Sequence, residues 1–138
     1  MNCHPLVAAL CIAVITTLVM ITIADDAEFA ACSEKYNSNL TADQFRANHT
    51  PILLSLDPNN NQSNCALICH ATALGLITEN ETIDLDALNV FKHRYISQPE
   101  CLSIKQCLEC ADRANQMDSS DCNLAKNYLT CIQNNISC

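Results

Sequence analysis

The pattern of apolar and polar side chains is most informative between Asn64 and Ile77 (NCALICHATALGLI), where nearly every residue is apolar. At about 3.6 residues per helical turn, Cys65 and Cys69 fall on one face of a helix, one turn apart. The opposite face carries three apolar side chains, Leu67, Ala71 and Leu74. This pattern predicts a buried helix that presents little to water besides His70 and Thr72. Because its two thiols can each reach a different neighbouring segment, we expect it to be the central helix of a cross-linked bundle.

Helical periodicity and capping residues predict further helices on both sides of this central helix. A first helix spans residues 26–37. A second begins at the capping box formed by Thr41 and Gln44 and ends before Pro51, which disfavours helical geometry in the residue before it. The segment 52–56 is apolar and of uncertain form, and a polar loop separates it from the central helix.

Three more helices are predicted after the central one. A fourth begins at Asp84, with the basic residues 92–94 off its apolar stripe and near its C-terminal end, where cations suit the helix dipole. The stripe consists of Leu85, Leu88, Phe91 and Tyr95. Pro99 opens a fifth helix that runs to about Asn115, and residues 118–121 cap a sixth.

The N-terminal segment differs from the rest of the chain. The apolar run Pro5–Ile23 followed by Ala24 predicts a signal peptide over residues 1–24, which leaves a helical domain over residues 25–138. The segment lacks Lys and Arg before the apolar run, and an uncleaved membrane anchor is the alternative. We favour cleavage because small residues lie at the end of the run and a cysteine-rich chain follows.

The cysteines and sequons indicate an exported, disulfide-bonded glycoprotein. Of the 11 cysteines, Cys3 and Cys11 belong to the predicted signal peptide, which leaves nine in the domain. Nine is odd, so at least one thiol is free or bonded to another molecule, and a homodimer through an unpaired cysteine is conceivable. Glycosylation on exposed turns is predicted at Asn39, Asn61, Asn80 and Asn135. A fifth sequon, at Asn48, is the weakest because Pro51 follows its triplet.

Charge and motif content argue against several classes of function. The net charge is −8 with no basic cluster, which argues against nucleic acid and anionic membrane surfaces as partners. The chain has a single glycine, Gly75, which favours helices over a β-rich disulfide fold. No catalytic motif or phosphate-binding loop is present, so we expect neither an enzyme nor a cofactor. The pair Cys107 and Cys110 lacks two further ligands at suitable spacing for zinc, so no metal site is expected.

Six of the nine cysteines follow the order Cys32-x32-Cys65-x3-Cys69-x40-Cys110-x11-Cys122-x8-Cys131. The x3 and x8 spacings are its specific parts. With this order, and with the sequence between Cys110 and Cys131, the chain resembles the insect odorant-binding proteins, also called pheromone-binding or general odorant-binding proteins. The resemblance covers essentially the whole domain. Cys107 could replace Cys110 as the fourth cysteine, and we prefer Cys110 on the local match.

The resemblance implies an all-α, six-helix, disulfide-braced bundle that encloses a hydrophobic cavity. It implies three bridges, Cys32–Cys69, Cys65–Cys122 and Cys110–Cys131. Three cysteines depart from the family's pattern. We expect at most one further bridge among them, joining Cys138 to Cys101 or to Cys107.

Apolar side chains that face the bundle interior are the candidates for the cavity lining, because ligand sites between helices are built from such side chains. The predicted ligand-binding residues are Leu53, Leu54, Leu56, Leu74, Leu88, Phe91, Leu108, Leu124 and Tyr128. We expect His49, His70 and His93 to be surface or hydrogen-bonded histidines rather than pH triggers.

The sequence therefore predicts a secreted, extracellular carrier. It would hold a small hydrophobic molecule (an odorant, pheromone or lipid-like compound) in an internal cavity, perform no chemistry on it and not insert into a membrane. The alternative is an extracellular interaction protein of a gland, venom or signalling system that acts through its surface, for example as a disulfide-linked dimer.

Overall fold

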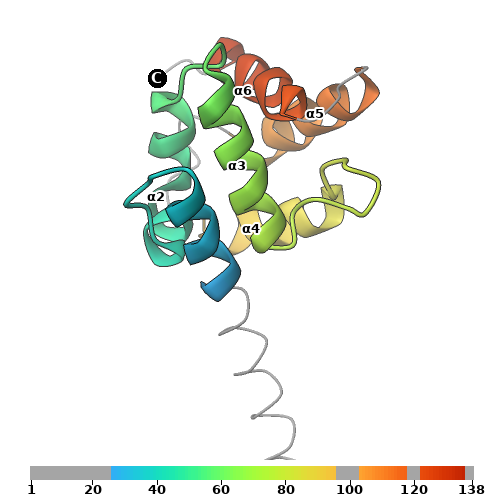
Figure 1. Cartoon of the computed structure of the whole chain (residues 1–138). Helices are drawn as coiled ribbons and strands as arrows, with labels where there is room; N and C mark the ends of the chain where they lie inside the picture. The colour runs from blue at the N-terminus through green and yellow to red at the C-terminus, as the bar shows by residue number, and fades with distance from the viewer. Residues whose placement is uncertain (1–25, 96–102, 118–121, 136–138) are drawn as a thin grey trace, which may run out of the picture.

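The structure is a computed structural model that describes residues 26–95, 103–117 and 122–135. Within these ranges it is all-α, with β structure limited to one isolated bridge between Ile77 and Ile83. Residues 26–35 are helical. The helices that follow are α2 (Ala42–Ser55), α3 (Asn61–Ala73), α4 (Leu85–Tyr95), α5 (Ile104–Gln116) and α6 (Asn123–Asn135) (Figure 1). The predicted all-α, disulfide-braced bundle is confirmed. The predicted signal peptide lies outside the described residues.

The predicted central helix is α3, which occupies the middle of the molecule in Figure 1. Asn60 caps its start, where the side-chain oxygen accepts a hydrogen bond from the Ser63 amide at 3.1 Å. Its end is set by Gly75, whose φ of 73° lies in the left-handed region that glycine adopts without strain. The Leu76 amide then donates to the Ala71 carbonyl at 2.9 Å, as in a Schellman motif. This turn directs the following segment, residues 76–83, back across the bundle.

Three disulfides connect α3 and α6 to their neighbours. Cys32–Cys69 joins the first helical segment to α3, with 5.8 Å between the Cα atoms. Cys65–Cys122 joins α3 to the residue before α6. Cys110–Cys131 joins α5 to α6. This is the pairing that the resemblance implied, and it places Cys110 rather than Cys107 in the fourth position.

Cys107 is a free thiol and is fully buried in α5. A bridge between Cys107 and Cys138 is therefore not formed, and that alternative was wrong. The other alternative, Cys101 with Cys138, lies outside the described residues.

The second and fifth helices each differ from prediction by more than two residues at one boundary. The second helix continues through Pro51 to Ser55, because its axis is interrupted at Asn48, where φ is −128° and ψ is 24°. Pro51 thus lies in the first turn of the following helical stretch, where its missing amide hydrogen breaks no helical bond. In the fifth helix, Ser103 is the N-cap and forms a capping box with Gln106, so the helix begins after the predicted start at Pro99.

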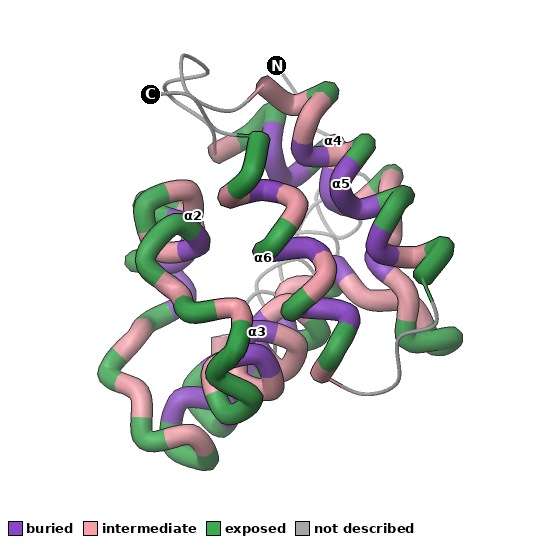
Figure 2. The backbone as a smooth tube through the Cα atoms, turned by 90° about the horizontal axis from the view of Figure 1, so that it is seen from above, coloured by how far each residue is buried: buried purple, intermediate pink, exposed green. Residues whose placement is uncertain are grey.

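The first helical segment covers one side of α3. Phe29 is fully buried and its ring stacks on that of His70, with 4.1 Å between the centroids. The Ser33 hydroxyl lies 3.1 Å from His70 Nε2. The expectation that His70 faces water was therefore wrong, because the first helical segment, residues 26–35, packs over that face of α3. Figure 2 shows buried and exposed residues alternating along the helices, so that each turns one face toward the common core.

The segment 76–83 is held against α5 by one side chain. The Asn115 amide group accepts a hydrogen bond from the Ile83 amide at 2.8 Å and donates one to the Ile83 carbonyl at 2.9 Å. The pair satisfies both backbone polar groups of a buried residue. Leu76, Ile77 and Ile83 are thereby fixed where they can contribute to an interior cavity.

Candidate ligand cavity

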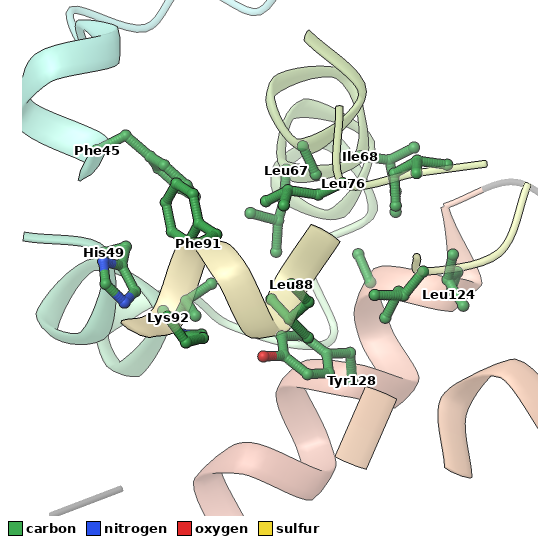
Figure 3. A pocket seen from close by; sticks show the side chains of 15 residues that line it. Phe45, His49, Leu67, Ile68, Leu76, Leu88, Phe91, Lys92, Leu124 and Tyr128 are labelled. Carbon is green, nitrogen blue, oxygen red and sulfur yellow. The ribbon is translucent and has the colours of Figure 1, made fainter. Parts of the chain in front are cut away.

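An interior cavity of about 50 Å³ lies between α2, α3, α4, α6 and the segment 76–83 (Figure 3). Each of these five parts contributes three side chains. Nearly all of the lining is apolar. Aromatic rings form part of the wall: the Phe91 ring lies 6.2 Å from the Phe45 ring and meets the His49 ring edge-on at 5.1 Å, measured between centroids. The geometry is that of a hydrophobic site inside a helical bundle.

Five of the nine predicted lining residues contribute to this cavity. They are Leu53, Leu88, Phe91, Leu124 and Tyr128. They come from α2, α4 and α6, and all five are buried. The residues predicted on the fourth and sixth helices therefore identified two of the walls, although Leu88 and Phe91 are only part of the wall that α4 forms.

The other four predicted residues lie outside the cavity. Leu54 is 38% exposed, because it follows the inward-facing Leu53 on a helix and points about 100° away from it. Leu56 is the C-cap of α2 and borders a different surface hollow. Leu74 is the C-cap of α3 and faces the hollow between α2 and α4. Leu108 packs against the core from α5, which contributes no side chain to the cavity.

The remaining lining residues were not among the nine predicted ligand-binding residues. They are Phe45, His49, Leu67, Ile68, Ala71, Leu76, Ile77, Ile83, Lys92 and Ala125. Lys92 was expected off the apolar stripe of its helix, yet it is only 1% exposed. The sequence held the information that corrects this, because Lys92 is four residues after Leu88 and so lies on the same helical face.

Three polar groups of the cavity lining are buried without a nitrogen or oxygen hydrogen-bond partner among the described residues. They are Lys92 Nζ, Tyr128 Oη and His49 Nε2. The other nitrogen of His49, Nδ1, lies 3.2 Å from the Arg46 carbonyl oxygen. Since a carbonyl can only accept, Nδ1 carries the proton of the neutral ring and Nε2 presents a lone pair.

Burial dominates the protonation of these groups. It lowers the pKa of Lys92, and it lowers the pKa of His49 to about 4, an effect to which the nearby charge of Lys92 adds. It raises the pKa of Cys107, and it raises that of Tyr128 well above its usual value. The Cys107 thiol is a weak hydrogen-bond partner of both Lys92 and Tyr128, and the Lys92 charge acts on His49, so the four groups lie close together. At neutral pH the histidine, thiol and phenol are therefore all uncharged.

The two other histidines do not reach the cavity. His70 is buried against Phe29 and Ser33, and burial lowers its pKa. His93 is exposed on α4. His93 is thus a surface histidine and His70 a hydrogen-bonded one, as expected. His49 is hydrogen-bonded through Nδ1 only, and its Nε2 has no partner among the described residues.

The predicted glycosylation sites, Asn39, Asn61, Asn80 and Asn135, all have exposed side chains. Asn39 and Asn80 lie outside helices, as expected for turns, whereas Asn61 and Asn135 are the first residue of α3 and the last of α6. In Asn135 the side-chain amide donates to the Cys131 carbonyl at 2.7 Å. Occupancy of these sites stays a prediction.

Over the described ranges, no cluster of three or more His, Cys, Asp or Glu side chains is arranged to hold a metal ion. The same part of the chain contains no helix long and apolar enough to cross a membrane. Three disulfides within one short chain are consistent with an extracellular protein, since such bonds persist in oxidising compartments. Comparisons with family models, with curated proteins and with solved structures found no match to this chain.

Proposed function

We propose that this protein is a secreted carrier that encloses a small hydrophobic molecule and releases it chemically unchanged. The observation that carries the proposal is the apolar cavity between four helices and the segment 76–83. The cysteine spacing that resembles the odorant-binding proteins supports it, as do the disulfides that brace the cavity walls. Removal of apolar ligand surface from water would supply the affinity, at about 25 cal/mol per Å².

The cavity must widen when a ligand enters. Its volume of about 50 Å³ is well below the roughly 300–1,000 Å³ of ordinary small-molecule sites. Side-chain rotation of its aliphatic walls and movement at the α2 kink near Asn48 are the available routes. The disulfides hold α3, α5 and α6 together, so α2 and α4, which none of the three described bridges reaches, are the helical walls best able to move.

The proposal is tested by displacement of a neutral apolar fluorophore with 1-octanol, using the purified protein with its disulfides oxidised. Saturable binding and competitive displacement are expected. Ala71→Leu places extra volume inside the cavity and should weaken both, whereas Ala47→Leu on the exposed side of α2 should leave them unchanged. No saturation by any apolar probe, or equal effects of the two variants, would overturn the carrier proposal.

The alternative is an interaction protein that acts as a disulfide-linked dimer. Six cysteines of the domain are paired within the chain, and Cys107 is fully buried and out of reach of a second molecule. A bridge between two chains would therefore have to use Cys101 or Cys138, which lie outside the described residues. We propose the carrier because the apolar cavity favours it, and a covalent dimer on a non-reducing gel would favour the alternative.

A further inference from the structure

Four buried side-chain nitrogen or oxygen atoms lack a nitrogen or oxygen partner within the described residues, and three of them belong to the cavity lining. The Cys107 thiol, a weak hydrogen-bonding group, is what Lys92 and Tyr128 have beside them. These three are Lys92 Nζ, Tyr128 Oη and His49 Nε2. Buried polar groups in proteins are almost always hydrogen-bonded, so such a concentration in one cavity requires an explanation. A bound molecule with a polar group would supply the missing partners.

We propose that Lys92 and Tyr128, with His49 beside them, bind the carboxylate of an aliphatic acid whose hydrocarbon chain occupies the apolar part of the cavity. The inference rests on the proposed carrier function and names the chemical class of its ligand. It goes beyond apolar burial, because it assigns a polar head group and the side chains that recognise it.

The charge balance of the cavity selects an anion. Lys92 is 1% exposed, and no Asp or Glu is among the lining residues. The neighbouring groups that could accept a proton or a charge are His49 from α2, Cys107 from α5 and Tyr128 from α6, and none carries a negative charge at neutral pH. A carboxylate brings a counter-ion that the described residues of the cavity do not provide, and so favours the protonated form of Lys92.

The donor and acceptor pattern fits the same group. The Lys92 ammonium and the Tyr128 hydroxyl are both donors, and a carboxylate can accept from both through its two oxygens. His49 Nε2 is an acceptor close to the Lys92 charge and is available to an ammonium hydrogen that the ligand leaves free. An alcohol or an ester could accept from one donor, but it would leave the lysine without a counter-ion.

The arrangement of the cavity separates head group from chain. In Figure 3 the Tyr128 hydroxyl is turned toward the side where Lys92 and His49 lie, and away from Ile68 and Leu124. One end of the cavity is therefore polar and the other aliphatic. An aliphatic acid has the same division.

The test compares octanoate with 1-octanol, which have the same chain length, by isothermal titration calorimetry on the purified protein. Charge-assisted hydrogen bonds predict that octanoate binds at least about ten-fold more tightly than 1-octanol. In Lys92→Met this preference should vanish through a loss of octanoate affinity, with 1-octanol changed by less than about two-fold. Tyr128→Phe should reduce octanoate affinity by a smaller factor, and Lys126→Met, on the exposed side of α6, should match the unaltered protein.

The outcomes separate the two proposals. Equal affinity for octanoate and 1-octanol, or an equal loss of both in Lys92→Met, overturns the carboxylate site and leaves the carrier function standing. If neither ligand binds the unaltered protein, the carrier function itself fails.

Discussion

Replacing Lys92 with methionine should stabilise the ligand-free protein. The side chain is 1% exposed, and its Nζ has no nitrogen or oxygen partner among the described residues, only the weakly hydrogen-bonding Cys107 thiol. A buried polar group without a partner costs about 1–3 kcal/mol, and methionine fills a similar unbranched volume with apolar atoms. The Lys92→Met substitution is therefore expected to raise the free energy of unfolding by about 1–3 kcal/mol.

Urea unfolding at neutral pH, with disulfides oxidised and helicity followed by circular dichroism, measures this change. Lys126→Met is the matched control, since Lys126 is exposed on α6 and its replacement should alter the unfolding free energy by less than about 0.5 kcal/mol. The dependence of the free energy on urea concentration should be the same in all three proteins, because the area exposed on unfolding hardly changes.

A Lys92→Met protein that is less stable than the Lys126→Met control would refute the reasoning. It would show that the ammonium group already has a favourable partner in the free protein. The cavity would then contain no unpaired positive charge for an anion to neutralise, and the carboxylate site would lose its physical basis.

Three further predictions concern His49, Cys107 and Gly75. Burial and the Lys92 charge hold the pKa of His49 at about 4 in the folded protein, whereas the pKa of the same side chain is near 6.5 in the unfolded chain. As the pH falls, the unfolded chain therefore binds the proton first, and the folded protein loses stability. The free energy of unfolding should be fully retained above pH 6.5 and fall by at most about 3 kcal/mol toward pH 4, and urea titrations should show a shallower fall in His49→Gln. The Cys107 thiol should resist alkylation by iodoacetamide in the folded protein and react at once in denaturant, as mass spectrometry would show; rapid labelling of the native state would contradict its burial. Gly75→Ala should cost about 1 kcal/mol in urea unfolding because of its positive φ alone, since an added Cβ meets no atom within 4 Å, and an unchanged stability would argue against the Schellman turn.

The arrangement of helices was largely predictable because cysteine spacing and helical phase constrain each other. Cys65 and Cys69 lie one turn apart on α3, so they could be bonded to two different segments, and the resemblance supplied their partners. Capping boxes gave some helix starts directly, as at Thr41. The continuation of α2 through Pro51 was not predictable from proline alone, because it depends on the interruption at Asn48.

The cavity was only partly predictable, because its polar groups depend on tertiary packing. An apolar stripe identifies a buried face but not which part of that face borders a cavity, and Leu108 was misplaced for this reason. Lys92 was placed off the apolar stripe, where lysine is ordinarily found, although its spacing from Leu88 puts it on the inward face. His70 was misplaced because the helix that covers it is distant in sequence.

The most direct test of ligand enclosure is the nuclear magnetic resonance of leucine methyl groups during titration with 1-octanol. The account predicts shifts of Leu53, Leu88 and Leu124 methyls and nuclear Overhauser contacts from them to the ligand chain, while Leu54 and Leu108 stay unchanged. Contacts confined to Leu54 or Leu108, or no contact at saturating ligand, would contradict the claim that the interior cavity is the binding site.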